Sequence, residues 1–555
     1  MLSSDSNILR SSIPVVIPTE RTVGEYVWHK LNSFDDNNVC LIDAYTGQQL
    51  TVGQLKHQSL SIGRALVAKG VTKSDKIAFY GHNSIQHSVL RFAAYFLGLP
   101  FCPLSPTFGA YEVGHEYRST GATIIMTTND DLPKFKDVID NTDNNTVNVV
   151  KLVVIFDGQH KDYLTYDQLL IDDGANDGQS LLAARVPYFD VDPDNDPFIY
   201  IHTSGSTGSP KCVKLKHQSI LILMHERGHF LDPDIVSSPG ALKKHCIAFP
   251  YPFGHISGSA ILPLQLCMGY PLVIYSQFDE HLLFKSVETY RITFLGTFPS
   301  FGRRLVDPDV FSRYDMSSLQ IVNTGGAAFP GNVARDIIDK YNVIFREGYG
   351  MTEYLFITAG RNIADEFKSG NCGPVSPGTE CKVADLATGQ PLGPNSDGEL
   401  CVRGLKLFAG YVNNDRAFGE AFDSDGWYRT GDIGHYDPSG NIYITDRLKE
   451  IIRVADGNLY VNVSPVEIEQ FLLTHPSIAE AAVVGVNNRS GTQWPRAYVK
   501  LNSGQTTVVS DIDIKKFVAD TLAYTKQLKG GVQFVDNIKR INIGKVDRKF
   551  YRNMV

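Results

Sequence analysis

Apolar and polar positions in the first third of the chain alternate between the periods of helices and strands. Apolar residues recur at helical spacing in two stretches, and each stretch ends at a glycine. The helical stretches are 54–69 and 84–98, and short apolar runs typical of buried strands occupy 76–80, 99–104 and 122–127. Helices that alternate with short apolar strands predict an α/β layer architecture with largely parallel pairing.

The middle of the chain continues this pattern. The most apolar run, Ser257 to Tyr275, is interrupted by Pro263, Gln265 and Gly269. A membrane-spanning helix usually needs about 20 predominantly apolar residues, so this run predicts a buried helix followed by a buried strand. Two further strands are expected, at 292–298 and 319–324.

The pattern changes after Ile451, where a separate module is expected. Ser464-Pro-Val-Glu467 is a capping box with proline at the first helical position, which predicts the start of a helix. Strand patterns follow at 478–486 and 496–501, and a helical pattern at 512–522. These elements predict a compact unit of about 100 residues with its own core.

Composition and charge narrow the classes of protein. Of the 555 residues 43% are hydrophobic and 20% charged, values typical of globular proteins, and the length predicts two or more domains. A formal net charge of −8 argues against nucleic acid as a partner. The eight cysteines form no Cys-x-x-Cys pair, so a disulfide framework or a zinc site is not expected.

The ends of the chain bear on its location. Residues 1–18 lack the long apolar segment of a secretory signal, and Asn553-Met554-Val555 differs from a peroxisomal Ser-Lys-Leu tripeptide. We therefore expect a cytoplasmic protein without a transmembrane span, although peripheral membrane contact remains open.

Candidate chemistry is concentrated first in the stretch Thr203 to Lys211, between two strand patterns. Its residues are almost all hydroxyl, glycine or lysine, and such a loop can surround a phosphate group with N–H and O–H donors and a positive charge. It is not a Walker loop, because Pro210 precedes the lysine and a strand rather than a helix follows. Taken alone, it could also be a flexible surface turn. The candidate ligands are Thr203, Ser204, Gly205, Ser206, Thr207, Gly208 and Lys211.

Three later clusters add to this site. Small residues at 324–328 follow a strand and would let a flat base lie close to the backbone; the alternative is a tight turn. Tyr349 could stack on a base, Thr352 could bind phosphate, and Glu353 could hold Mg²⁺ through hard oxygen ligands. Asp432 could accept both hydroxyls of a ribose, as acidic residues do in other nucleotide sites, or could be a turn residue.

These clusters, in this order, resemble the adenylate-forming superfamily of acyl-CoA synthetases, 4-coumarate–CoA ligases, luciferases and peptide-synthetase adenylation domains. The resemblance covers nearly the whole chain. The matching stretches are 203–211, 349–353, 398–404 with Gly410-Tyr411, 428–432, 446–449 and Gly544-Lys545, with Asn83-Ser84 and 314–319 most like the coumarate-ligase and luciferase branch.

The resemblance implies an α/β fold with a large N-terminal domain of layered α/β subdomains, residues 1–446, and a small mobile C-terminal α+β domain, residues 447–555. It also implies an ATP-dependent carboxylic acid–CoA ligase that works through an acyl-adenylate, with ATP, Mg²⁺ and CoA as cofactors. A small carboxylic acid, fatty or aryl-propenoic, would be the substrate.

The resemblance assigns the roles residue by residue. The implied catalytic residues are Lys545, Thr352, Glu353 and Lys211, with Glu353 on the metal. The implied nucleotide ligands are the 203–208 loop, Gly325, Gly326, Ala327, Tyr349, Asp432 and Arg447. His255, Gly350 and Phe301 would line the acid pocket, and Lys449 would be the hinge.

Three departures from the family pattern matter. Cys212 stands where a glycine is usual, which would cost energy if the backbone needed a positive φ. His255 lies in Phe-Gly-His-Ile-Ser rather than directly after the phenylalanine, and 453–461 is longer than usual near the expected thiol site. Cys212 and the 453–461 segment leave open a nucleotide-binding pseudoenzyme that senses AMP or a lipid acid. A luciferase-type oxygenase also stays open, because that chemistry would use the same adenylation site.

Overall fold

The computed structural model describes residues 7–554, except for several short segments. The segments not described are 141–148, 172–184, 204–210, 231–244, 298–300, 327–328, 359, 361–366, 457–458, 488–492, 503–508 and 542–544, together with the side chains of 227–230, 311 and 455–462.

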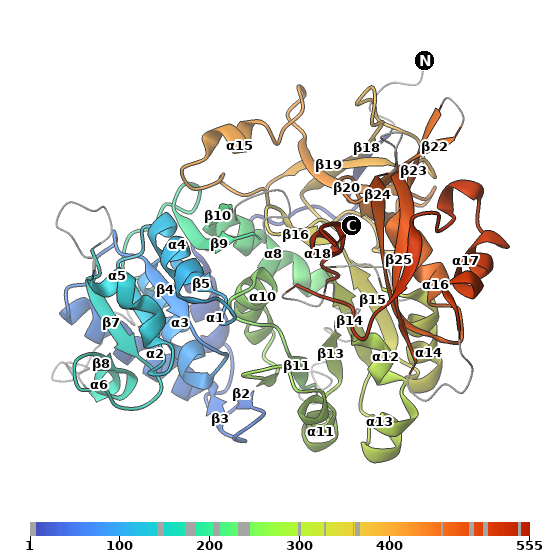
Figure 1. Ribbon diagram of the computed structural model, residues 1–555. Helices are drawn as coiled ribbons and strands as arrows, with labels where there is room; N and C mark the ends of the chain where they lie inside the picture. The colour runs from blue at the N-terminus through green and yellow to red at the C-terminus, as the bar shows by residue number, and fades with distance from the viewer. Residues whose placement is uncertain are drawn as a thin grey trace.

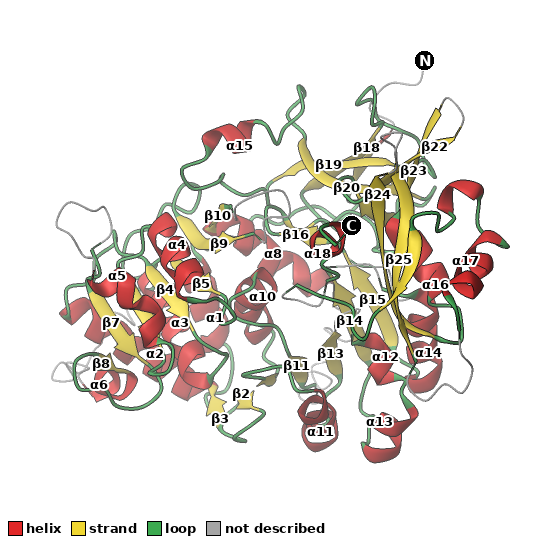
Figure 2. Ribbon diagram, in the orientation of Figure 1, coloured by secondary structure: helices red, strands yellow, loops and turns green. Residues whose placement is uncertain are grey.

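Two seven-stranded sheets form the body of the large N-terminal domain (Figures 1 and 2). The first has the order β10 (Cys212–Lys216), β9 (Pro197–His202), β5 (Phe101–Leu104), β4 (Ile77–Tyr80), β6 (Ile124–Thr127), β7 (Leu152–Ile155) and β8 (Leu164–Thr165). The second has the order β15 (Ile344–Gly348), β14 (Ile321–Gly325), β13 (Phe294–Thr297), β11 (Ile247–Phe249), β12 (Leu272–Ile274), β2 (Val39–Asp43) and β3 (Gln49–Thr51). Pairing is parallel except at one edge of each sheet, which confirms the predicted architecture.

Helices cover these sheets. They are α1 (Val23–Asn32), α2 (Val52–Ala68), α3 (Ile85–Leu97), α4 (Ala110–Thr120), α5 (Lys136–Asp140), α6 (Tyr166–Ile171), α8 (His217–Phe230), α10 (Ile256–Leu266), α11 (Glu280–Tyr290), α12 (Gly302–Leu305), α13 (Pro308–Arg313) and α14 (Gly331–Tyr341). Helix α3 is buried on nearly every face: most of its residues are apolar, and the polar residues His87, Ser88 and Arg91 are buried as well. Ser84 caps its first turn, and Gly98, where the sequence pattern placed the end of this helix, ends it in the left-handed conformation.

The predicted apolar run 257–275 forms the buried helix α10 and the strand β12. Among the described residues, no helix is both long and apolar enough to cross a membrane.

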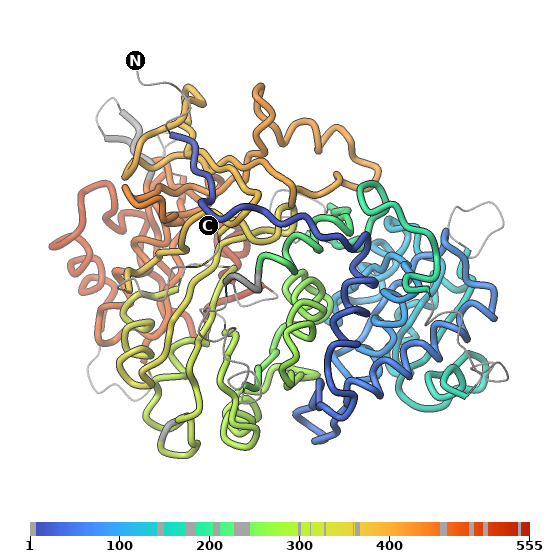
Figure 3. Tube along the Cα trace, turned by 180° about the vertical axis from the view of Figure 1, so that it is seen from behind, coloured from blue at the N-terminus to red at the C-terminus, as the bar shows by residue number. Residues whose placement is uncertain are grey.

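A third, five-stranded sheet carries the later polar clusters. Its order is β1 (Ile8–Arg10), β18 (Thr379–Ala384), β19 (Gly398–Gly404), β20 (Tyr428–Tyr436) and β21 (Ile442–Arg447), and the helix α15 (Asp415–Gly419) lies between β19 and β20 in sequence. The N-terminal strand β1 pairs with β18, and Figure 3 shows the chain then running across the back of the molecule to α1. The short hairpin of β16 (Gly350–Met351) and β17 (Leu355–Phe356) follows the second sheet.

The small C-terminal domain has its own core, as expected. Its sheet of β24 (Ile478–Asn487), β25 (Gln493–Leu501) and β26 (Gly531–Phe534) packs with α16 (Pro465–Leu472), α17 (Asp511–Ala519) and α18 (Arg548–Arg552). Ser464 caps α16 by accepting from the Glu467 N–H. The predicted capping box is only half present, however, because the Glu467 carboxylate pairs with Lys526 instead.

Candidate active site

The hydroxyl- and glycine-rich loop connects two antiparallel strands, β9 and β10, so the predicted strand–loop–strand arrangement is confirmed. The Thr203 N–H donates to the Lys211 carbonyl at 2.9 Å and closes the base of the loop. The Lys211 ammonium lies over the Tyr411 ring, 4.9 Å from its centroid. The predicted phosphate ligands Ser204, Gly205, Ser206, Thr207 and Gly208 lie outside the described residues.

Asp432 is the centre of a buried polar cluster. Register pairs it with Arg447 across β20 and β21, and the Arg447 Nε lies 2.8 Å from Asp432 Oδ1. The Tyr349 hydroxyl donates to Oδ2 at 2.7 Å. The Asp432 carboxylate raises the pKa of Arg447. A carboxylate has about four acceptor sites, so these two contacts leave capacity for further hydroxyl donors such as those of a ribose.

Glu353 lies in the turn of the β16–β17 hairpin, next to Thr352. The Tyr411 hydroxyl donates to Glu353 Oε1 at 3.1 Å, so Glu353 and Lys211 both contact the same tyrosine. Burial raises the pKa of Glu353, and a bound cation would reverse that effect by favouring the carboxylate. A single carboxylate suits Mg²⁺, which usually keeps waters and substrate phosphates as its other ligands.

Lys545 reaches this cluster from the C-terminal domain. Its Cε lies 4.0 Å from the position that a Cβ on Gly326 would take, at the end of β14. Burial lowers the pKa of Lys545 to about 8, with nearby Arg447 and Lys449 contributing. The structure therefore brings the predicted catalytic lysine beside the predicted nucleotide residues.

His255 caps the first turn of α10 and faces the same region. Its Nδ1 lies 2.8 Å from the Ser257 hydroxyl. Burial lowers the pKa of His255 to about 4, and the Lys545 charge adds to this shift. A neutral imidazole near Lys545 fits a pocket that receives the acid, and this role stays a prediction.

Sequence reasoning missed the side chains that hold the His255 loop. The Asn83 amide donates to the Tyr251 carbonyl at 2.9 Å, and its oxygen accepts from the Phe253 N–H at 2.8 Å. Arg91, fully buried on α3, donates to the Phe253 carbonyl at 2.7 Å and to the Ser259 hydroxyl at 3.1 Å. An arginine within a mostly apolar helix is the signal that could have indicated this.

The other residues predicted to line the acid pocket or to bind the base are three small residues and Phe301, and their surroundings differ where the structure describes them. A Cβ on Gly350 would lie 1.9 Å from the Leu355 carbonyl, so the hairpin itself requires glycine there. Gly325 stands opposite Gly348 on β15, and a Cβ on Gly325 would lie 3.0 Å from the Gly348 carbonyl oxygen. Phe301 is 5% exposed and its ring packs in the core beside those of Phe278 and Phe284, so its part in the acid pocket stays a prediction. Ala327 lies outside the described residues.

The predicted hinge follows β21 directly. The Leu448 N–H donates to the Gly431 carbonyl at 2.9 Å, and Glu450 pairs with Arg552 of α18. Burial lowers the pKa of Lys449 to about 8, and Arg447 adds to this. Lys449 thus stands where the nucleotide cluster leads into the small domain.

The structure also describes two of the segments in which the sequence departs from the family pattern. Cys212 lies in β10 opposite His202 and is not among the residues with positive φ, so its side chain costs no backbone strain. The long segment 453–461 falls within an antiparallel hairpin of β22 (Ile452–Asp456) and β23 (Leu459–Val463).

Comparison with known proteins gives matches over almost the whole chain. The family "AMP-binding enzyme" matches residues 28–412, and "AMP-binding enzyme C-terminal domain" matches residues 467–545. The luciferin 4-monooxygenase of Nipponoluciola cruciata is 30% identical over 557 residues, covering 100% of this chain and 98% of its own. The 4-coumarate–CoA ligase 1 of Narcissus pseudonarcissus is 29% identical and covers 99% and 97%.

Solved structures share the fold. ATP-bound MatB from Rhodopseudomonas palustris superimposes with a TM-score of 0.81 at 22% identity, covering 96% of this chain and 99% of its own. The anthranilate CoA ligase AuaEII in complex with anthranoyl-AMP gives a TM-score of 0.80 at 19% identity, covering 97% and 98%. By its matched domains and its fold, the chain belongs to the AMP-binding, adenylate-forming enzyme superfamily.

Proposed function

We propose that this protein is an ATP-dependent carboxylic acid–CoA ligase. In the first step a carboxylate oxygen attacks the α-phosphorus of ATP and pyrophosphate leaves, which gives an acyl-adenylate. In the second step the CoA thiolate attacks the acyl carbon and AMP leaves. The position of Lys545, delivered from the C-terminal domain to the Asp432–Arg447 cluster, is the observation that supports this proposal most.

The first step joins two anions, so it needs positive charge where negative charge develops. Lys545 would contact the reacting carboxylate and the α-phosphate. Asp432, with Arg447 and Tyr349 fixed on its two oxygens, would accept the ribose hydroxyls. Lys211 and the loop that it ends would hold the β- and γ-phosphates.

Glu353 is the residue that would hold Mg²⁺, with Thr352 beside it on the phosphates. The metal would neutralise phosphate charge during pyrophosphate departure. The Tyr411 hydroxyl bond keeps the Glu353 carboxylate oriented without adding a charge of its own.

The second step would need Lys545 to leave and the thiol to enter. A rotation of residues 447–555 against residues 1–446 about Lys449 would achieve this, and such closing and opening movements commonly separate the steps of an enzyme. The 4-coumarate–CoA ligase relatives support CoA as acceptor and an aryl-propenoic acid as one candidate substrate; a fatty acid is the other.

A product screen tests the proposal. Purified protein, Mg-ATP and CoA would be incubated with a pool of fatty and aromatic acids, and AMP, acyl-adenylate and acyl-CoA would be recorded by mass spectrometry. A CoA thioester is the expected product and would identify the acid. Acyl-adenylate without thioester would refute CoA as the acceptor, and folded protein that forms neither product would refute the ligase assignment.

The luciferin 4-monooxygenase relatives support a second candidate, an oxygenase built on the same adenylation site. The same incubations followed for oxygen uptake and light emission would separate it from the ligase. A nucleotide-binding pseudoenzyme is less well supported, because Lys545 and Glu353 are both in place and Cys212 causes no strain.

A further inference from the structure

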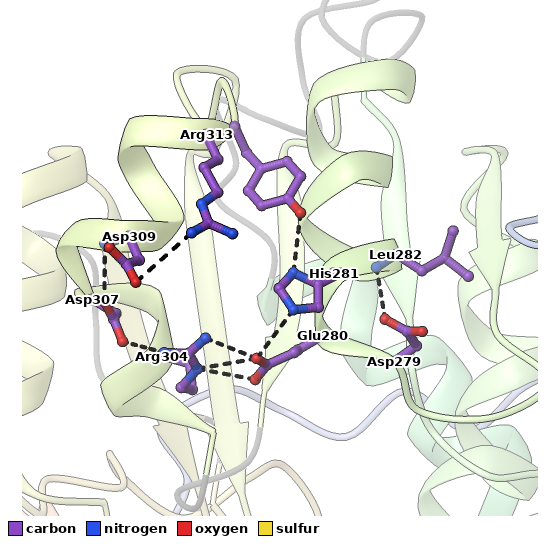
Figure 4. Close-up of polar contacts among 9 residues, drawn as sticks. Asp279, Glu280, His281, Leu282, Arg304, Asp307, Asp309 and Arg313 are labelled. Carbon is purple, nitrogen blue, oxygen red and sulfur yellow. Dashed lines mark hydrogen bonds and ion pairs between the residues drawn. The ribbon is translucent and has the colours of Figure 1, made fainter. Parts of the chain in front are cut away.

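Helix α12 carries two successive arginines whose contacts lie in different domains. Arg304 forks onto Glu280 of α11, with Nε 3.0 Å from Oε2 and Nη2 2.8 Å from Oε1, and also pairs with Asp307 (Figure 4). All of these partners belong to the large domain. The Arg303 Nη2 instead donates to the Leu473 carbonyl of the C-terminal domain at 3.3 Å.

Leu473 is the C-cap residue of α16, so Arg303 binds the carbonyl end of that helix. Carbonyls in the last turn lack partners within their own helix, and a cation there is favoured by the helix dipole. Arg303 is half-buried, and burial lowers the pKa of its guanidinium, while Asp336 of α14 and Glu480 of β24 act against that shift. The contact therefore draws on charges from both domains.

The opposite end of α16 is fixed as well. The Ser464 hydroxyl, at its N-cap, donates to Asp446 Oδ2 at 2.6 Å, next to the predicted hinge. Glu469 in the middle of α16 pairs with Arg548 at 2.7 Å, three residues beyond Lys545. Helix α16 is thus attached at both ends to the large domain and the hinge strand, and by its middle to the segment that carries the catalytic lysine.

We infer that Arg303 is a positioning residue for Lys545: by capping α16 from the large domain, it holds the C-terminal domain in the orientation that performs adenylation. This inference rests on the proposed function. Loss of the contact would favour the rotated orientation, so adenylation would slow and thioester formation from supplied adenylate would quicken. Each rate is proportional to the population of its orientation, so the ratio of the two rates should fall about fivefold wherever the equilibrium starts.

The test measures both half-reactions in Arg303→Ala. Pyrophosphate release would be followed with 4-coumarate or dodecanoate and Mg-ATP without CoA, and thioester formation with the synthetic adenylate of the same acid and CoA. Arg303→Lys, which keeps a cation able to reach the carbonyl, should recover much of the ratio. Arg304→Ala is the matched control, because it removes a neighbouring arginine whose partners all lie in the large domain.

A distance measurement makes the inference independent of turnover. All eight native cysteines are buried or half-buried, so spin labels would go on Lys285→Cys and Ile512→Cys, whose native side chains are exposed. Arg303→Ala should shift the distance distribution between the domains, and Arg304→Ala should leave it unchanged. An unchanged distribution in Arg303→Ala, or equal loss of both half-reactions, would overturn the inference. Absence of adenylate from the unaltered protein, with the distance shift present, would instead overturn the proposed ligase.

Discussion

The lowered pKa of Lys545 predicts an unusual pH profile for adenylation. The protonated ammonium is the form that neutralises the reacting anions, so activity should fall as the pH rises through about 8. At pH 9 only about one molecule in ten would keep the proton, against about 97% for a lysine with an ordinary pKa. The kcat/KM for ATP, which reports the free enzyme, should therefore fall about tenfold between pH 7 and pH 9.

Lys449 provides the variant that identifies the titrating group, since its own pKa is also lowered to about 8. Lys449→Met removes a positive charge near Lys545, so the alkaline limb should remain and move to higher pH. The assay is pyrophosphate release without CoA, which keeps the thiol's titration out of the profile. If kcat/KM stayed constant from pH 7 to 9.5, the reasoning about Lys545 would be refuted. If Lys449→Met no longer lost activity at alkaline pH, the titrating group would be Lys449 itself.

Three further changes have defined outcomes. Asp432→Asn removes the charged acceptor of the cluster, so the KM for ATP should rise about 10- to 100-fold in pyrophosphate release, whereas an unchanged KM would exclude its ribose role. Lys406→Met leaves Glu226 buried without its 2.7 Å partner and should cost about 3–5 kcal/mol, or about 3–5 °C in Tm for a unit of several hundred residues; Lys406→Met with Glu226→Leu should recover most of it, and thermal unfolding checks both. Arg91→Met should raise the KM for the acid and not that for ATP, because Arg91 anchors the loop before His255; a rise in both would indicate general unfolding.

Local patterns predicted most elements, because their signals lie within a few residues. The bounds of α3, near Ser84 and Gly98, follow from its apolar spacing and from the glycine that ends it. The capping box at Ser464 was half wrong for a physical reason: Lys526, 59 residues away, competes for the Glu467 carboxylate. Such a competitor cannot be read from the local sequence.

The sequence predicted which residues form the site, but it predicted few of the contacts between them. Motif order brought Asp432 and Arg447 together as nucleotide residues, but their direct pairing depends on the β20–β21 register. Arg91 was missed because its acceptors, the Phe253 carbonyl and the Ser259 hydroxyl, lie 162 and 168 residues away. Arg303 was missed likewise, since its acceptor belongs to another domain.

The β20–β21 hairpin has a consequence for how the two half-reactions follow one another. Asp432 stands opposite Arg447, and the predicted pivot at Lys449 comes two residues later along the same backbone. Under the proposed function, domain rotation can change the affinity for the nucleotide. Because linkage is reciprocal, the bound nucleotide then shifts the rotational equilibrium by the same free energy. The nucleotide would then be an effector of the domain movement as well as a substrate, and the exchange of AMP for ATP would reset the enzyme for its next cycle.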